Sequence, residues 1–268
     1  MELRDRVALV TGGGRRVGRA IAKGVAERGA VLAIHYNDSA RGAEELQKEI
    51  QSAGGTAEVF QADLSNTEAA KALPAQVAKR FGRLDILINS AGIMKSATVE
   101  DTTAALWDET MAVNLRSAFF TVQGALPWLR PAKGKVVNLA DVGGLEPWPR
   151  YSAHCVSKAG VVMLTKVLAR ALAPDITVNA IAPGAVLPPD NWGKDALDHL
   201  ALPLPSSDSG RRRTSSPPYC IFWKAETTSP AKPWWWMEEG CSGERAAAGR
   251  DRDRRRRLLW NLLYTPAR

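Results

Sequence analysis

The sequence predicts a doubly wound parallel α/β sheet in a single domain, followed by an irregular C-terminal tail. Residues 7–21 pass from an apolar run through a glycine-rich turn into residues at helical spacing. Short apolar runs alternate with helical patterns as far as residue 184, and this pattern ends near residue 205. A chain of 268 residues with 45% hydrophobic content can bury one large core. We therefore expect one domain over residues 1–204 and an irregular segment over 205–268.

The expected elements follow from the spacing of their apolar residues. The first helix begins near Arg16, where Val17, Ile21 and Val25 share one face. Pro74 lies inside the third predicted helix, so we expect it to kink or shorten that helix. Strands are expected from residue 7 and at 31–36, 57–61, 84–88, 135–139 and 176–181, and the later helices at 41–53, 69–81, 103–129 and 152–172.

Glycines and polar residues gather where these strands end, which is the edge at which an open α/β sheet binds ligands. Gly12 and Gly14 let the first turn approach a phosphate closely, and Gly18 lets the helix pack tightly on the strand. Unpaired N–H groups and the positive end of the helix dipole make this turn suitable for a pyrophosphate. The sequence thus predicts one dinucleotide-binding crevice.

This turn resembles the Thr-Gly-x-x-x-Gly-x-Gly fingerprint of the short-chain dehydrogenases/reductases, a family with the Rossmann fold, and the resemblance covers about residues 1–204. Arg16 replaces the middle glycine, which resembles the pteridine-reductase-like branch. The resemblance implies that Asp63 holds the adenine, that the turn at 89–92 lines the cofactor and that Asn114 supports the catalytic lysine. The predicted cofactor-binding residues are Thr11, Gly12, Gly14, Arg16, Val17, Gly18, His35, Tyr36, Asn37, Ser39, Asp63, Leu64, Asn89, Ala91, Gly92, Lys158, Pro183 and Gly184.

Charge at the end of the second strand favours NADPH over NADH. An acidic residue there would bind the ribose hydroxyls of NAD and repel a 2′-phosphate. Here the strand ends in His35, Tyr36 and Asn37, with Arg16 nearby in the turn. Asp38 is a counter-argument, because pteridine-reductase-like proteins often have a basic residue about there.

Reduction of a C=O or C=N bond by a nicotinamide needs a proton donor, which the family supplies as Tyr-x-x-x-Lys. Lys158 is the lysine, but His154 stands four residues before it in place of the tyrosine. Tyr151 is about 10 Å from Lys158 along a helix, too far to substitute without a rearranged helix start. Asp141 stands where most family members have serine, and this too resembles the pteridine-reductase-like branch. The predicted catalytic residues are therefore Asp141, His154, Lys158 and Asn114.

These residues predict an NADPH-dependent oxidoreductase that reduces a pterin-like carbonyl or imine by hydride transfer. Histidine has a shorter reach than tyrosine and a pKa near 6.5, so we expect reduced or altered activity. In the alternative interpretation His154 has no role and the chain is a non-catalytic dinucleotide-binding remnant. Pteridine reductases typically stack the pterin on an aromatic residue near the position of Met94, and the absence of one here weakens a pterin as the specific substrate.

Composition excludes several other classes. No apolar run approaches a membrane span and the first six residues are too short and polar for a signal peptide, so we expect a cytoplasmic protein. Three cysteines without metal-site spacing indicate neither a metal site nor a disulfide framework. Residues 205–268 hold 13 Lys and Arg against 7 Asp and Glu, so most of the net charge of +8 belongs to the tail. A nucleic-acid-binding tail is a further alternative, although we expect no specific nucleic acid partner.

The tail has the composition of out-of-frame translation. Trp234 to Met237 must be encoded TGG TGG TGG ATG, and if the preceding proline codon is CCG, the shifted frame gives Val-Val-Val-Asp. Permissible codons on either side extend this alternate reading, which resembles the last helix and strand of the family. We therefore expect a frameshift between about residues 197 and 206, no strand between 206 and 249, and an uncovered apolar sheet edge. Family members commonly pair their subunits through those last elements, so the altered tail puts a homo-oligomer in doubt.

Overall fold

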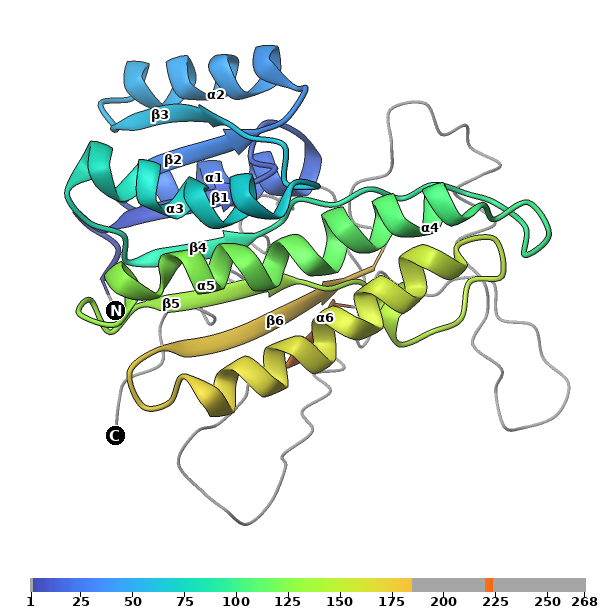
Figure 1. Cartoon of the computed structure of the whole chain (residues 1–268). Coiled ribbons are helices and arrows are strands. Elements are labelled where there is room, and N and C mark those ends of the chain that lie inside the picture. Colours follow the sequence, from blue (N-terminus) through green and yellow to red (C-terminus); the bar gives the residue numbers. More distant parts are fainter. Residues whose placement is uncertain (1, 185–219, 224–268) are drawn as a thin grey trace, which may run out of the picture.

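The computed structural model describes residues 2–184 and 220–223, which form a seven-stranded sheet with helices on both faces (Figure 1). The strand order is β3-β2-β1-β4-β5-β6-β7, and β1 to β6 pair in parallel. The predicted doubly wound parallel sheet is confirmed. The strands are β1 (Val7–Thr11), β2 (Val31–Tyr36), β3 (Ala57–Gln61), β4 (Ile86–Asn89), β5 (Lys135–Leu139), β6 (Thr177–Pro183) and β7 (Cys220–Trp223).

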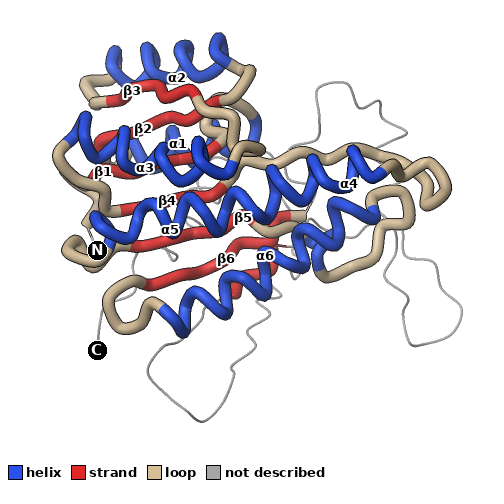
Figure 2. The backbone as a smooth tube through the Cα atoms, in the orientation of Figure 1, coloured by secondary structure: helices blue, strands red, loops and turns tan. Residues whose placement is uncertain are grey.

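Each face of the sheet is covered by helices that bury an apolar side, and Figure 2 shows α3, α5 and α6 side by side over one of these faces. On that face Leu73, Leu129 and Leu168 pack with the strands, whereas on the other face Ile21 of α1 and Leu46 of α2 do so. The helices are α1 (Arg16–Ala26), α2 (Ala40–Ser52), α3 (Thr67–Phe81), α4 (Ala104–Met111), α5 (Ser117–Leu129) and α6 (Ser152–Ala171).

Two helices differ from the prediction. The helix expected over 103–129 is interrupted by a π-helical segment at Ala112–Arg116, which separates α4 from α5. Pro74 does not shorten α3, which spans 15 residues and begins after Asn66, whose side chain accepts a hydrogen bond from the Ala69 N–H. Pro74 is buried inside α3, where it removes one backbone hydrogen bond without ending the helix.

The outer edge of β6 carries a seventh strand, and the expectation that no strand forms between 206 and 249 is wrong at this point. β7 pairs antiparallel with β6, from Ala180 opposite Trp223 to Pro183 opposite Cys220. The edge expected to be uncovered is therefore paired over four residues. The junction expected at 197–206 and the run of tryptophans at 234–236 lie outside the described residues.

Along the described part of the chain, no helix has both the length and the apolar character needed to cross a membrane. The cytoplasmic location expected from the sequence stays a prediction.

Candidate active site at the carboxyl edge of the sheet

The glycine-rich turn lies between the end of β1 and the start of α1, and the helix packs directly on it. A Cβ added to Gly18 would lie only 2.2 Å from the carbonyl oxygen of Gly12, so only glycine allows this approach. Arg15, the N-cap of α1, makes no side-chain cap hydrogen bond, and the first turn of the helix has no acidic residue. The first N–H groups of α1 thus lack a side-chain cap, which fits an anionic group at this turn.

Arg16 stands where the family fingerprint has glycine, and the backbone conformation at this position explains why glycine is preferred there. Its φ angle is +46°, in the left-handed region that residues with a side chain seldom adopt. Such a conformation costs on the order of 1–3 kcal/mol and persists where the surroundings impose it. The chain therefore places a guanidinium beside the turn at an energetic cost.

His35 holds the glycine turn from inside the protein. Its Nδ1 accepts a hydrogen bond from the Gly12 N–H at 3.1 Å, and its Nε2 donates to the carbonyl of Ala62 at 3.0 Å. Its own carbonyl accepts from the Gly13 N–H at 2.9 Å. Burial lowers the pKa of His35, so the ring stays neutral with its proton on Nε2. Because both ring nitrogens are engaged within the protein, His35 positions the glycine turn in this structure, and its place in the cofactor site stays a prediction.

Acidification is expected to weaken the fold through His35. The unfolded chain protonates this histidine near pH 6.5, whereas the folded chain resists until a lower pH, so stability is lost as the pH falls below about 6.5. Urea unfolding of the wild type and of His35→Asn, from pH 7.5 to pH 5, measures this contribution. The stability advantage of the wild type should shrink with acidification, and a constant difference would contradict the role given to the ring.

Thr11 and Asn89, both predicted to bind the cofactor, turn their side chains inward. Thr11 Oγ1 accepts hydrogen bonds from the N–H groups of Ser90 and Ala91 at 2.9 and 3.0 Å, which joins the ends of β1 and β4. Asn89 Nδ2 donates to Asn138 Oδ1 at 2.9 Å within the sheet. These side chains join neighbouring strand ends at this edge of the sheet, and their polar atoms are satisfied inside the protein.

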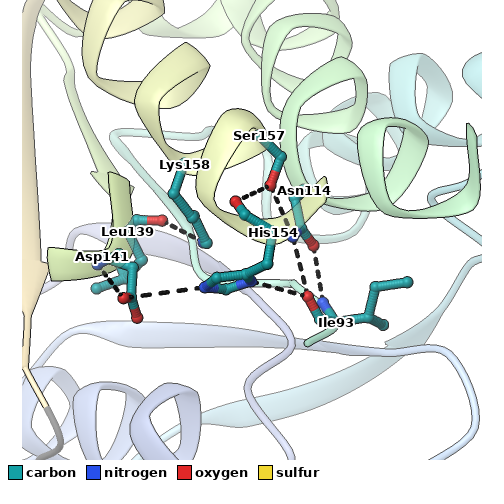
Figure 3. A network of polar contacts seen from close by, with 8 residues as sticks. Ile93, Asn114, Leu139, Asp141, His154, Ser157 and Lys158 are labelled. Atoms are coloured by element: carbon teal, nitrogen blue, oxygen red, sulfur yellow. Dashed lines mark hydrogen bonds and ion pairs between the residues drawn. The ribbon is translucent and has the colours of Figure 1, made fainter. Parts of the chain in front are cut away.

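Lys158 of α6 lies beside the loop at residues 89–92, which follows β4. That loop also contacts the glycine turn. A Cβ added to Gly12 would lie 2.9 Å from the Cα of Ala91, and one added to Gly92 would lie 3.6 Å from Lys158 Nζ. The ammonium donates a hydrogen bond to the carbonyl of Leu139 at the end of β5, at 2.7 Å (Figure 3). The structure thus brings the predicted lysine to the predicted crevice.

The ammonium of Lys158 is held in an unfavourable environment. Burial lowers its pKa from 10.5 to about 8, and the carboxylate of Asp141 opposes this shift only in part. Lys158 is therefore a cation near neutral pH that changes charge within an accessible range. Strongly shifted groups of this kind are typical of functional sites.

His154, one turn before Lys158, lies between Asp141 and the backbone of Ile93 (Figure 3). Its Nδ1 is 3.2 Å from the Ile93 carbonyl, which can only accept, so Nδ1 carries the proton. Its Nε2 is 3.9 Å from Asp141 Oδ1, beyond hydrogen-bond length, and is buried with no partner. A neutral imidazole therefore presents a lone pair, not a proton, on the nitrogen that faces Asp141.

Trp148 covers the histidine. The two rings are parallel within 5°, with centroids 6.1 Å apart, and Trp148 also contacts Tyr151 edge to face at 6.1 Å. Tyr151 precedes α6 and is not part of the helix that bears Lys158. The start of α6 at Ser152 is therefore compatible with the prediction that Tyr151 does not replace the missing tyrosine.

Asn114 lies in the π-helical segment and holds the peptide groups of Ile93. Its Oδ1 accepts from the Ile93 N–H at 2.7 Å, and its Nδ2 donates to the Ile93 carbonyl at 2.9 Å and to Ser157 Oγ at 3.0 Å. The side chain thus ties the loop after β4 to α6 and acts on the position of His154 and Lys158 through that loop.

The remaining predicted residues lie along the same edge with different exposure. Asn37, Asp63 and Gly92 are exposed, whereas the Leu64 side chain is buried. Asp63 accepts hydrogen bonds from the backbone and hydroxyl of Ser65 at 2.9 Å each. Ile93 and Leu139 have no sequence signal, because both act through backbone carbonyls. Arg15 has none either, because its pairing with Asp38 depends on the folded turn.

The fold is a doubly wound sheet, and its carboxyl edge carries a glycine turn suited to phosphates and a buried lysine. These features define a class of dinucleotide-binding oxidoreductases. The chain belongs to the short-chain dehydrogenase family, whose profile matches residues 6–196. It is 38% identical over 182 residues to the 3-oxoacyl-[acyl-carrier-protein] reductase FabG of Staphylococcus aureus, covering 67% of this chain and 74% of that protein.

Two solved structures are similar to this one. A dehydrogenase/reductase from Sinorhizobium meliloti 1021 has a TM-score of 0.69 and 39% identity, over 75% of this chain and 80% of that one. The FolM alternative dihydrofolate reductase 1 from Brucella canis, complexed with NADP, has a TM-score of 0.70 and 34% identity, over 76% of this chain and 81% of that one. The chain is therefore an oxidoreductase of this family.

Proposed function

We propose that this oxidoreductase binds NADPH and reduces a pterin-like carbonyl or imine compound at a strongly reduced rate. The observation that carries the proposal is the arrangement at the end of α6. Lys158 is a buried cation beside the turn that follows β4, whereas His154, one helical turn before it, has an Nε2 without a partner.

NADPH is supported by the chemistry of the turn and by the Brucella canis structure, which is complexed with NADP. The uncapped start of α1, together with Arg16, suits the phosphates, and the loop at 89–92 suits the nicotinamide half beside Lys158. When bound, NADPH supplies a hydride from its nicotinamide ring. The set of cofactor-binding residues given above belongs to this proposal.

The protein must then supply a proton to the oxygen or nitrogen of the substrate. In the proposed site His154 is the donor, and only its imidazolium form has a proton on Nε2, because Nδ1 already donates to Ile93. Reduction is therefore slow, because a neutral ring presents a lone pair and no proton on this nitrogen.

The choice of substrate rests on Arg16 and Asp141, which resemble the pteridine-reductase-like branch, and on the similarity to FolM. The Staphylococcus aureus relative is a reductase of a 3-oxoacyl group, which also favours a carbonyl compound. Both similarities are compatible with a substrate that has a conjugated C=N or C=O bond.

A second candidate is a dinucleotide-binding protein without turnover. The observation that favours it is the sealed position of His154, which is 5% exposed and stacked against Trp148. A side chain buried to this extent is poorly placed to contact a substrate.

Fluorescence titration with NADPH, followed by a turnover assay with an oxidised pterin and a cyclic diketone, distinguishes the two candidates. We expect NADPH binding with slow oxidation of the cofactor, and we expect His154→Phe to abolish that oxidation. Binding without any turnover by the wild type would favour the non-catalytic protein. Failure of both NADPH and NADH to bind a folded sample would contradict both candidates.

The division into residues 1–204 and an out-of-frame segment over 205–268 belongs to the same proposal. It is supported by the permitted codons of Trp234 to Met237, which read Val-Val-Val-Asp in the shifted frame. The loss of the family's own last strand would weaken a homo-oligomer that pairs through it. Sequencing the gene across codons 197–206 tests the shift, since codons that do not permit the alternate reading would refute it.

A further inference from the structure

A row of four buried polar side chains crosses the sheet from α5 to α6. Thr121 Oγ1 donates a hydrogen bond to Asn89 Oδ1 at 2.8 Å, Asn89 Nδ2 donates to Asn138 Oδ1 at 2.9 Å, and Asn138 Nδ2 donates to Thr165 Oγ1 at 2.9 Å. The two threonines belong to the helices, and the two asparagines belong to β4 and β5. None of the four residues is more than 7% exposed. A buried network with its partners in place specifies one arrangement of the elements that it joins.

The bond at the α6 end of this row has one possible direction. Thr165 Oγ1 donates its only proton to the Val161 carbonyl at 2.8 Å, so it meets Asn138 as an acceptor. An apolar residue at position 165 would therefore leave the Asn138 amide donor unpaired in the interior, which is unfavourable. Because a hydrogen bond is directional and an apolar contact is not, this bond specifies where α6 lies against β5.

The next residue of β5 contacts α6 through Lys158. Leu139 directly follows Asn138, and its carbonyl accepts the hydrogen bond from Lys158 Nζ at 2.7 Å. Lys158 and Thr165 are seven residues apart in α6, which is about two helical turns, so both lie on one side of the helix. Two consecutive residues of β5 therefore hold the same side of α6.

We infer that Asn138 and Thr165 are positioning residues, which fix α6 against β5 and thereby hold the Lys158 ammonium in its buried place beside the crevice. This inference rests on the proposed function, which gives Lys158 its role in the reaction. A charged group is more stable in water than in the interior, so the ammonium favours any movement of α6 that would admit water. The bond between Asn138 and Thr165 opposes that movement, because it forms at only one position of the helix.

Thr165→Val tests the inference, because it keeps the shape of the side chain and removes the hydroxyl that Asn138 needs. Without this bond we expect water to reach the ammonium and the pKa of Lys158 to rise by about one unit from its lowered value of about 8. The measurement is the difference in stability to urea between each protein and its Lys158→Met derivative, from pH 6 to pH 10.

The expected pH profiles follow from the lowered pKa. In the wild type, the gain in stability from Lys158→Met is constant below about pH 8 and shrinks above it, because the buried ammonium then loses its proton. In the Thr165→Val background the gain should be smaller at pH 7 and should begin to shrink about one pH unit higher. Thr165→Ser keeps the hydroxyl and should retain the profile of the wild type.

Thr121→Val is the matched control, because it removes the same hydroxyl from the same row at the α5 end. It should leave the profile unchanged, although it also removes a buried hydrogen bond. If Thr165→Val does not fold, Thr165→Ala replaces it, since the smaller side chain leaves room for a water molecule on the Asn138 amide.

Three results would overturn the inference: an unchanged profile without the Thr165 hydroxyl, an equal shift in Thr121→Val, or an equal shift in Thr165→Ser. These measurements involve no nucleotide. Failure of the proposed function would therefore be seen separately, as an absence of NADPH and NADH binding by the folded wild type.

Discussion

His154→Tyr is expected to raise the rate of NADPH-dependent reduction about 100- to 10,000-fold, the range that a positioned general acid contributes. A phenol carries its proton on the oxygen at physiological pH, whereas the neutral His154 ring has none on Nε2. The buried Lys158 ammonium one turn away would lower the pKa of that phenol and ease the proton transfer. Cofactor oxidation with an oxidised pterin or a cyclic diketone, measured at pH 7 for both proteins, gives the comparison.

His154→Phe is the control for this substitution, because it supplies the aromatic ring without the hydroxyl. Both variants lose the hydrogen bond to the Ile93 carbonyl, so any structural cost of that loss is shared between them. If the tyrosine and phenylalanine variants bind NADPH equally and turn over equally slowly, position 154 is not the proton donor.

Lys158→Met is expected to stabilise the fold while abolishing turnover. A pKa lowered from 10.5 to about 8 means that the charged lysine destabilises the folded state by about 3 kcal/mol below pH 8. The lost hydrogen bond to the Leu139 carbonyl offsets about 1 kcal/mol of the gain. Urea unfolding at pH 7 should therefore show a variant that is about 2 kcal/mol more stable than the wild type.

The pH dependence supplies the sign of this effect. The unfolded chain binds more protons than the folded chain between about pH 8 and pH 10.5, so the stability of the wild type rises relative to the variant across that window. The gain in the variant should be constant below pH 8 and should shrink above it. Lys79→Met, at an exposed position of α3, should change stability by less than about 0.5 kcal/mol at every pH. A gain as large in this control would attribute the effect to the added apolar side chain.

The sheet and its flanking helices could be predicted from the sequence because each element has a regular apolar period. The buried strand at Val7–Thr11 and the Ile21 face of α1 depend on local patterns that the fold preserves. The strand at Cys220–Trp223 could not be predicted, because its place is set by pairing with β6 and not by a period of its own. The π-helical segment was also not predicted, since one additional residue in a helical turn leaves the apolar pattern nearly unchanged.

The sequence predicts where in the fold the candidate site lies, but it does not predict the contacts that its side chains make. Spacing brings Lys158 and His154 to one side of a helix and puts both near the strand ends. It does not indicate whether a side chain points into the crevice or away from it, and for this reason the inward side chains of Thr11 and His35 needed the structure. The 3.9 Å separation of His154 Nε2 and Asp141 Oδ1 depends on the path of the connection between β5 and α6, which has no regular apolar period.

The wide turn at Ala112–Arg116 has a consequence for insertions and deletions in this chain. Removing one residue there would let the segment close into ordinary α-helix with its backbone bonds made, so folding would tolerate the loss. Because the wide turn absorbs one additional residue, α4 and α5 would keep nearly their present rotation about the helix axis. The effect would instead fall on Asn114, which lies in this turn: its deletion would remove both hydrogen bonds to Ile93 while the sheet stayed intact.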